Sequence, residues 1–178
     1  MQTERRAEVA LRSNRRQPFI LISHSFLESM FTPLIRHLQT SGYPIIYTMG
    51  RESGVQEVRQ LREEQTTLNT PLIKREILEK ALNRLSQMGW GKITLAQYSF
   101  IDGGVSISIK FNPFTEECKS KTKTSCIFLR GLISGITSEI LEEDMQFSNP
   151  ICQVTEDETC LLHLRRARDG VEIHNTFY

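Results

Sequence analysis

Near the start of the chain, the apolar positions repeat with the period of an amphipathic helix. Between residues 25 and 40 they recur every three or four positions, which predicts one helix over this segment. Ser25 is expected to cap this helix and Gly42 to end it. Pro33 falls inside the segment, where its ring and its missing N–H are expected to kink the helix or split it.

Two further helices are predicted before residue 92. The first has Pro44 in its first turn, and Gly50 and Gly54 inside it lower its helix propensity by about 1 kcal/mol each, so we expect something to pack close to their backbone. The second begins after Thr70, a good N-cap residue, and stops at Gly89. Its predicted inner stripe consists of Ile73, Ile77, Ala81, Leu85 and Met88.

The period then changes to two, which predicts strands over residues 92–100 and 104–111 joined by the turn "IDGG". One face of the second strand is apolar and is expected to be buried. Its members are Val105, Ile107, Ile109 and Phe111. The other face carries Ser106, Ser108 and Lys110 and is expected to be wet.

A strongly apolar helix is predicted over residues 125–142, and short strands follow it. Gly131 and Gly135 share one face of this helix, so that face favours close approach of another backbone or a flat ligand, or tight packing of the helix on the sheet. The expected strands lie at 145–148, 151–155 and 160–166. The order of elements predicts an α+β fold, with N-terminal helices, a twisted antiparallel sheet and a long packed helix.

Charge and composition narrow the class of protein. The chain has 178 residues and a net charge of +1, so we expect a single domain and no nucleic-acid partner. No stretch is apolar over the roughly 18 residues that a membrane span needs. We expect a basic tail at 1–17, one domain at 18–170 and a second tail at 171–178. The basic tail is expected to be a solvated tail, and the alternative is a weak anchor to an acidic partner or a membrane surface.

The cysteines are the clearest candidates for chemistry. Cys126 stands at the start of the last helix, where the helix dipole favours a thiolate. Cys152 and Cys160 flank a turn between two predicted strands, so strand pairing would bring them together. These positions fit zinc ligands, buried free thiols or a redox pair, and the spacing does not choose among them.

Catalytic motifs are missing from the sequence. It contains no GxGxxG after a strand and no CxxC, and its four histidines are scattered. We expect His163 to be an ordinary strand residue that is exposed or hydrogen-bonded. We therefore interpret the chain as a non-enzyme.

The segment from Gly89 to Leu164 resembles the 4-vinyl reductase domain family. The matching stretches are "GWGKITL", the hairpin leading to "FNPF", "SCIFLRGLISGI" and "CQVTEDETCLLHL", in that order. This family shares its fold with the vesicle-tethering TRAPP subunits, and it supplies the sensor domains of aromatic-responsive bacterial activators. The resemblance therefore implies a TRAPP-like α+β domain.

The resemblance also implies a structural zinc site. Metal-binding family members hold zinc with three cysteines and a glutamate, and Cys126, Cys152 and Cys160 stand at the cysteine positions. Asn149 stands where the glutamate is expected, and it is a poorer ligand than a carboxylate. Water, Glu156, Glu158 or Cys118 are alternatives for the fourth ligand.

The function implied by the resemblance is binding of an apolar small molecule or a tetrapyrrole, linked to (bacterio)chlorophyll metabolism or photosystem assembly. The expected location is the cytoplasm, either away from membranes or at the periphery of a (photosynthetic) membrane. A TRAPP-like adaptor or homodimer, joined through the N-terminal helices, is the alternative, and a genuine vinyl reductase is a weaker one. Expected ligand-binding residues are Trp90, Phe111, Phe128, Gly131 and Gly135. The aromatic residues among them could instead be ordinary residues of the hydrophobic core, and the same two interpretations apply to Phe100 and Phe114.

Overall fold

The computed structural model describes residues 22–63, 70–99, 103–114, 124–148, 153–154 and 158–167. The predicted tails at 1–17 and 171–178 lie outside these ranges, so the proposed domain limits stay predictions. Within the described ranges, no helix is long and apolar enough to cross a membrane.

The first described helix, α2 (His24–Leu38), starts slightly earlier than the sequence predicts. Its N-cap is Ser23, whose hydroxyl accepts a hydrogen bond from the N–H of Phe26 at 3.2 Å, so the prediction of Ser25 as the cap was wrong. Pro33 lies inside α2, which remains one continuous helix.

The end of α2 differs from the prediction for a backbone reason. Gln39 adopts a positive φ of 49°, which ends the helix, and a short 3-10 turn, η1 (Gln39–Ser41), follows. Gly42 has an ordinary helical φ of −70° and begins α3 (Gly42–Glu63) instead of ending α2. The predicted helix with Pro44 in its first turn is therefore confirmed, and the role given to Gly42 was wrong.

The next helix, α4 (Pro71–Gln87), has the predicted ends. The hydroxyl of Thr70 accepts from the N–H of Ile73, Pro71 occupies the first turn, and Gly89 has a φ of 94°. The buried face is rotated from the predicted stripe, because Ile73, Ile77 and Met88 are only partly buried. Its fully buried residues are Leu78, Ala81, Leu82, Arg84 and Leu85.

The remaining elements form an antiparallel sheet and one long helix, as predicted. They are β1 (Lys92–Tyr98), β2 (Val105–Lys110), α6 (Thr124–Leu141), β3 (Met145–Phe147), β4 (Gln153–Val154) and β5 (Cys160–Arg166). The strand order is β1-β2-β5-β3, and β4 pairs with β5 as well. The strand β5 is thus central, with β2 along one edge and β3 and β4 sharing the other.

One face of this sheet builds the core. Val105, Ile107 and Ile109 are at most 1% exposed and pack with apolar residues of α4 and α6. Phe111 was expected to continue this face, but its side chain is 84% exposed. The strand ends at Lys110 and Phe111 has a φ of 54°, so the alternation of side chains stops there.

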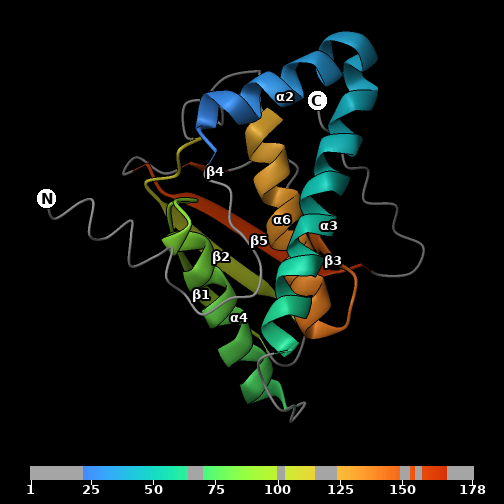
Figure 1. Ribbon diagram of the computed structural model, residues 1–178. Coiled ribbons are helices and arrows are strands. Elements are labelled where there is room, and N and C mark those ends of the chain that lie inside the picture. The colour runs from blue at the N-terminus through green and yellow to red at the C-terminus, as the bar shows by residue number, and fades with distance from the viewer. Residues whose placement is uncertain are drawn as a thin grey trace, which may run out of the picture.

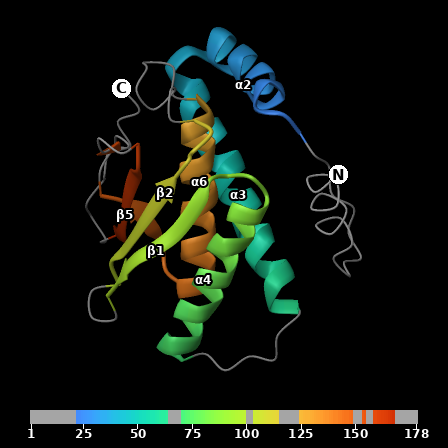
Figure 2. The same cartoon turned by 90° about the vertical axis from the view of Figure 1, so that its left-hand side faces the viewer.

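The helices are arranged around α6. Figure 1 shows α3 running beside α6, while α2 lies across the end of the molecule where α6 begins. Figure 2, turned by 90°, shows β1 and β2 in front of α6 and α3 on its far side. The long apolar helix is thus enclosed between the sheet and α3, which explains why its residues are apolar nearly all round.

Candidate functional site

Four glycines lie where α3 and α6 touch. They are Gly50 and Gly54 on α3 and Gly131 and Gly135 on α6. A Cβ atom on Gly131 would overlap the carbonyl oxygen of Tyr47, and one on Gly135 would overlap that of Arg51. The expected close approach is therefore made by the backbone of α3. This contact is helix on helix, neither helix on sheet nor helix on ligand, and it fills the space in front of both glycines.

Aromatic side chains gather at the N-terminal end of α6. This aromatic cluster consists of His24, Phe31, Trp90, Phe114 and Phe128. The ring centroids of Trp90 lie 5.8 Å from those of Phe114 and Phe128, and the Phe128 ring is stacked on the indole. His24 lies 5.0 Å from Phe114, and Phe31 lies 5.3 Å from Phe128. These separations are typical of favourable aromatic pairs.

A glycine on each side sets the position of Trp90. Gly89 and Gly91 have φ values of 94° and 95°, a left-handed conformation that glycine adopts without strain. The backbone N–H of Trp90 donates to the carbonyl of Leu85 at 3.2 Å, which ties the turn to the end of α4. The indole remains only partly buried. The stretch "GWG" therefore holds a half-exposed tryptophan against α6.

Asn112 positions Phe114, another member of the aromatic cluster. Its side-chain oxygen accepts from the N–H of Phe114 at 3.0 Å, which closes a tight turn in the stretch "FNPF". Its amide nitrogen donates to the sulfur of Cys160 at 3.3 Å. Phe114 is 2% exposed and is thereby fixed beside Trp90. Asn112 thus connects the aromatic cluster to the start of β5.

The α2 side of the cluster rests on a small second core. Phe31, Ile46 and Ile127 are its fully buried members. Phe31 is the one residue of α2 that is fully buried. Leu27 and Leu34 pack at the edge of this core and keep part of their surface exposed. The helix α2 therefore closes the aromatic cluster through a few side chains.

The structure describes two of the four expected zinc ligands. Cys126 and Cys160 are buried in the same hydrophobic core. Cys152 and Asn149 lie outside the described residues, as does Cys118. Among the residues that are described, no three acidic, histidine or cysteine side chains form a metal-binding group. The zinc site therefore stays a prediction.

His163 has an ordinary structural role on the less buried face of the sheet. Its Nδ1 lies 2.9 Å from the hydroxyl of Ser106 on the neighbouring strand, and its carbonyl accepts from the N–H of Ser148 at 2.9 Å. This arrangement confirms the interpretation of His163 as a hydrogen-bonded strand residue.

The structure brings together some of the predicted site residues and separates others. Trp90 and Phe128 are stacked, whereas Phe111 is exposed. His24 and Phe31 were missed, because nothing local in the sequence shows that α2 folds back onto the turn after α4. Asn112 was also missed, although an asparagine between two aromatic residues is a recognisable turn signal.

Comparison with known proteins supports the fold. Neither a family model nor a curated protein matches the sequence. The chain is similar to the crystal structure of the phenol-responsive sensory domain of the transcription activator PoxR, solved with phenol. The TM-score is 0.66 at 14% identity, and the match covers 93% of this chain and 90% of that one. The predicted α+β fold is confirmed, and the chain shares it with a regulatory sensory domain.

Proposed function

We propose that this chain is a non-catalytic domain that binds a small aromatic molecule at the aromatic cluster. The observation that carries the proposal is the partly buried Trp90, which stacks on Phe128 and lies tilted against Phe114, in a cluster that α2 closes through a few side chains. Aromatic side chains that are only partly buried favour an aromatic ligand, which gains both burial and ring stacking. The shared fold with a phenol-responsive sensory domain supports the same ligand class.

Movement of α2 would give the ligand access to the aromatic cluster. Because α2 is fastened mainly by Phe31, a small outward shift of α2 would open space between His24 and Phe128 without disturbing the sheet. His24 and the indole N–H of Trp90 supply polar groups that could orient a hydroxyl on the guest. A larger, tetrapyrrole-type ligand would need α2 to move further. Binding experiments with phenol and with a porphyrin therefore distinguish a small ligand from a large one.

Trp90 makes the proposal directly testable, because it is the single tryptophan of the chain. Titration with phenol, and separately with protoporphyrin, should change its fluorescence in a saturable way. Binding should also raise the melting temperature by mass action. A fluorescence change that saturates with protoporphyrin and not with phenol would favour the hypothesis of a tetrapyrrole ligand and its link to chlorophyll metabolism.

Two matched variants locate the binding site. Phe128→Leu removes a ring of the aromatic cluster and should weaken binding by about fivefold, since an aromatic pair contributes about 1 kcal/mol beyond burial. Phe111→Leu changes an exposed ring outside the cluster and should leave binding unchanged. Fluorescence that stays constant with both probes up to their solubility limit would contradict the proposed function.

We also propose that zinc is held by Cys126, Cys152 and Cys160, as the sequence resemblance implies. The two described thiols fit this donor set in type and share one core, and the sulfur of Cys160 already accepts one N–H bond from Asn112. A bound zinc ion would serve structure by joining the start of α6 to β5.

A native mass spectrum taken without chelators tests the zinc proposal independently of any organic ligand. The expected result is a mass excess of one zinc ion, which Cys152→Ser removes together with several kcal/mol of stability. The variant Asn149→Glu should increase resistance to chelators. A bare polypeptide mass, or a loss below about 1 kcal/mol in Cys152→Ser, would leave ordinary buried thiols.

A second candidate function is that of a protein-interaction adaptor. The observation that favours it is a set of apolar side chains, each 38–50% exposed, on α2, two residues before its start and on the first half of α3. They are Ile22, Phe26, Met30, Leu38, Ile45 and Met49. Sedimentation over a range of protein concentrations tests self-assembly, which Met30→Lys should abolish. A monomer at all micromolar concentrations would argue against a homodimer through these helices.

A further inference from the structure

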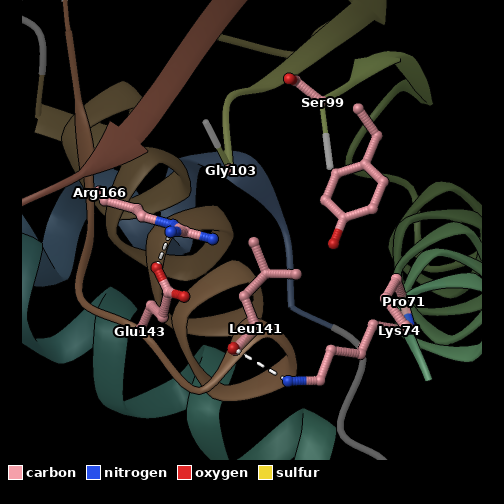
Figure 3. Close-up of a pocket in the computed structure, with 8 residues that line it drawn as sticks. Pro71, Lys74, Ser99, Gly103, Leu141, Glu143 and Arg166 are labelled. Carbon is pink, nitrogen blue, oxygen red and sulfur yellow. Dashed lines mark hydrogen bonds and ion pairs between the residues drawn. The ribbon is translucent and has the colours of Figure 1, made fainter. Parts of the chain in front are cut away.

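A pocket lies at the other end of α6, roughly 20 Å from the aromatic cluster along the helix axis. It has a volume of about 150 Å³ and forms where α4 begins and where β1, α6 and β5 end. All the residues that line it belong to the described part of the chain. Figure 3 shows the charged side chains of Lys74, Glu143 and Arg166 among the residues that line this pocket.

The walls of the pocket combine apolar and charged surfaces. Pro71 and Leu141 supply apolar surface, and the ring of Tyr98 adds more. The charged groups in the lining are Lys74, Arg166 and Glu143, and each of the two cations is paired with a carboxylate, Lys74 with Glu142 and Arg166 with Glu143. Apolar walls beside two cations that keep further N–H donors favour a small molecule with a short apolar body and a single negative charge.

Arg166 offers the better-placed donors. Its Nε pairs with the carboxylate of Glu143, and Gly103 lies directly against the guanidinium, where a Cβ atom would overlap it. These two contacts fix the plane of the guanidinium. The rest of its fork projects toward the middle of the pocket (Figure 3). A guanidinium with one edge paired keeps terminal N–H groups for a second carboxylate.

Lys74 enters the pocket from the first turn of α4. Its side chain is 19% exposed, and its Nζ donates to the carbonyl of Leu141 at 3.2 Å and to the carboxylate of Glu142 at 3.2 Å. An ammonium carries three N–H donors, so these two partners leave one for a ligand. The contact with Leu141 also satisfies the last turn of α6, which holds the ammonium in place.

We propose that this pocket binds a short-chain carboxylic acid. The carboxylate accepts hydrogen bonds from the terminal N–H groups of Arg166, Lys74 adds a second cation to the same pocket, and the alkyl part rests on Tyr98 and Leu141. Charge-assisted hydrogen bonds of this type are short and strong, and the guanidinium fork matches the two oxygens of a carboxylate. This site is separate from the aromatic cluster, so the protein would respond to two chemically different small molecules.

Propionate is the probe of choice, because it has no ring that could enter the aromatic cluster, and propionamide is its neutral counterpart of the same shape. Propionate added to the ¹⁵N-labelled full chain should shift the amide signals of Lys74, Ser99 and Gly103 in a saturable way. Propionamide should shift them far less. The fluorescence of Trp90 should stay constant, which keeps this test independent of the proposed aromatic ligand.

Substitutions identify the charges that hold the acid. Arg166→Gln should weaken propionate binding by roughly ten- to a hundredfold, as expected for the loss of charge-assisted hydrogen bonds. Arg75→Gln removes one positive charge from the neighbouring position of α4, whose side chain pairs with Glu79 on the helix surface, and should leave binding unchanged. Arg166 lies at the exposed end of β5, so its replacement is expected to preserve the fold.

Any one of several results would overturn the proposal. They are equal shifts with propionamide, shifts that do not saturate, unchanged affinity in Arg166→Gln, and equal weakening in Arg75→Gln. Inorganic phosphate that displaces propionate at equal concentration would also overturn it, because that result identifies a general anion site. None of these results bears on phenol binding, which is read from Trp90.

Discussion

The helix α6 makes two very different contacts with the N-terminal helices. Against α3 it presents Gly131 and Gly135, and the two backbones touch with no side chain between them. Against α2 it presents Phe128, a half-buried ring that meets Phe31 at 5.3 Å. The first contact leaves no room for adjustment, whereas the second can part without breaking a backbone contact. A rigid frame beside an adjustable cover is what a ligand-binding domain needs.

The largest effect is expected from a single methyl group at the rigid contact. Gly131→Ala places a Cβ against the carbonyl oxygen of Tyr47, so α3 must move away, and the free energy of unfolding should fall by about 3 kcal/mol or more. This loss exceeds the roughly 1 kcal/mol that alanine gains over glycine in helix propensity. Urea denaturation measures it.

Gly89→Ala is the matched control for that change. A Cβ on Gly89 meets no atom within 4 Å, so the cost is limited to the positive φ, about 1–2 kcal/mol. If Gly131→Ala cost no more than Gly89→Ala, the two helices could separate freely, and the description of the contact as rigid would be wrong.

A smaller, more local effect is expected on the adjustable side. Phe31→Ala removes the one fully buried side chain of α2, a loss of at most about 3 kcal/mol, because it cannot exceed what the docking of α2 contributes. Hydrogen exchange should become fast in α2 and stay slow in α6. The side chain of Phe26, on the same helix, is 50% exposed, so Phe26→Ala should change the free energy of unfolding by less than about 0.5 kcal/mol. Faster exchange across α6 as well would show that α2 is part of the frame.

The smallest effect concerns an ion pair that supports the frame. Arg51 on α3 donates to Asp144, just after α6, at 2.5 Å. Burial raises the pKa of Asp144, but hydrogen bonds from Arg51 and Gln146 and the charge of Arg51 outweigh it, so the pKa lies below its ordinary value of 3.8. A carboxyl group with a lowered pKa stabilises the fold above its unfolded pKa, and this stabilisation is lost as the pH falls through the folded pKa.

The variant Asp144→Asn isolates this contribution. Unfolding of both proteins by urea at about pH 7 and about pH 3 should show a difference below about 1 kcal/mol at the higher pH, because the pair is partly exposed. The difference should shrink at the lower pH. A difference that grows on acidification would contradict the direction given for the pKa.

Local patterns were enough to predict most of the elements. Thr70 and Pro71 mark the start of α4, and the alternation through Val105, Ile107 and Ile109 gives β2 with its correct face. One error concerns the buried face of α4, and the others lie at the ends of elements, where the conformation of a single residue decides the outcome. Gln39 takes a positive φ and ends α2, and Phe111 does the same after β2, although neither residue type announces it.

The site could be predicted in part for a physical reason. Trp90 and Phe128 stand in recognisable motifs, so the sequence singled them out. Their partners His24 and Phe31 come from α2, and the pocket at the far end of α6 joins Lys74 to Arg166, which are separated by about half of the chain. Such contacts depend on how elements pack, which the periodicity of one segment does not encode.

The glycine contact also gives this fold a recognisable signature in sequence. Gly50 and Gly54 stand four residues apart, and so do Gly131 and Gly135, because each pair occupies successive turns of one helix. Any larger residue at these positions would push two backbones apart, so distant relatives should keep both pairs after most other identities have been lost. A search for two such pairs on separate helices, followed by the stretch that forms β3 to β5, could find relatives at identities as low as 14%.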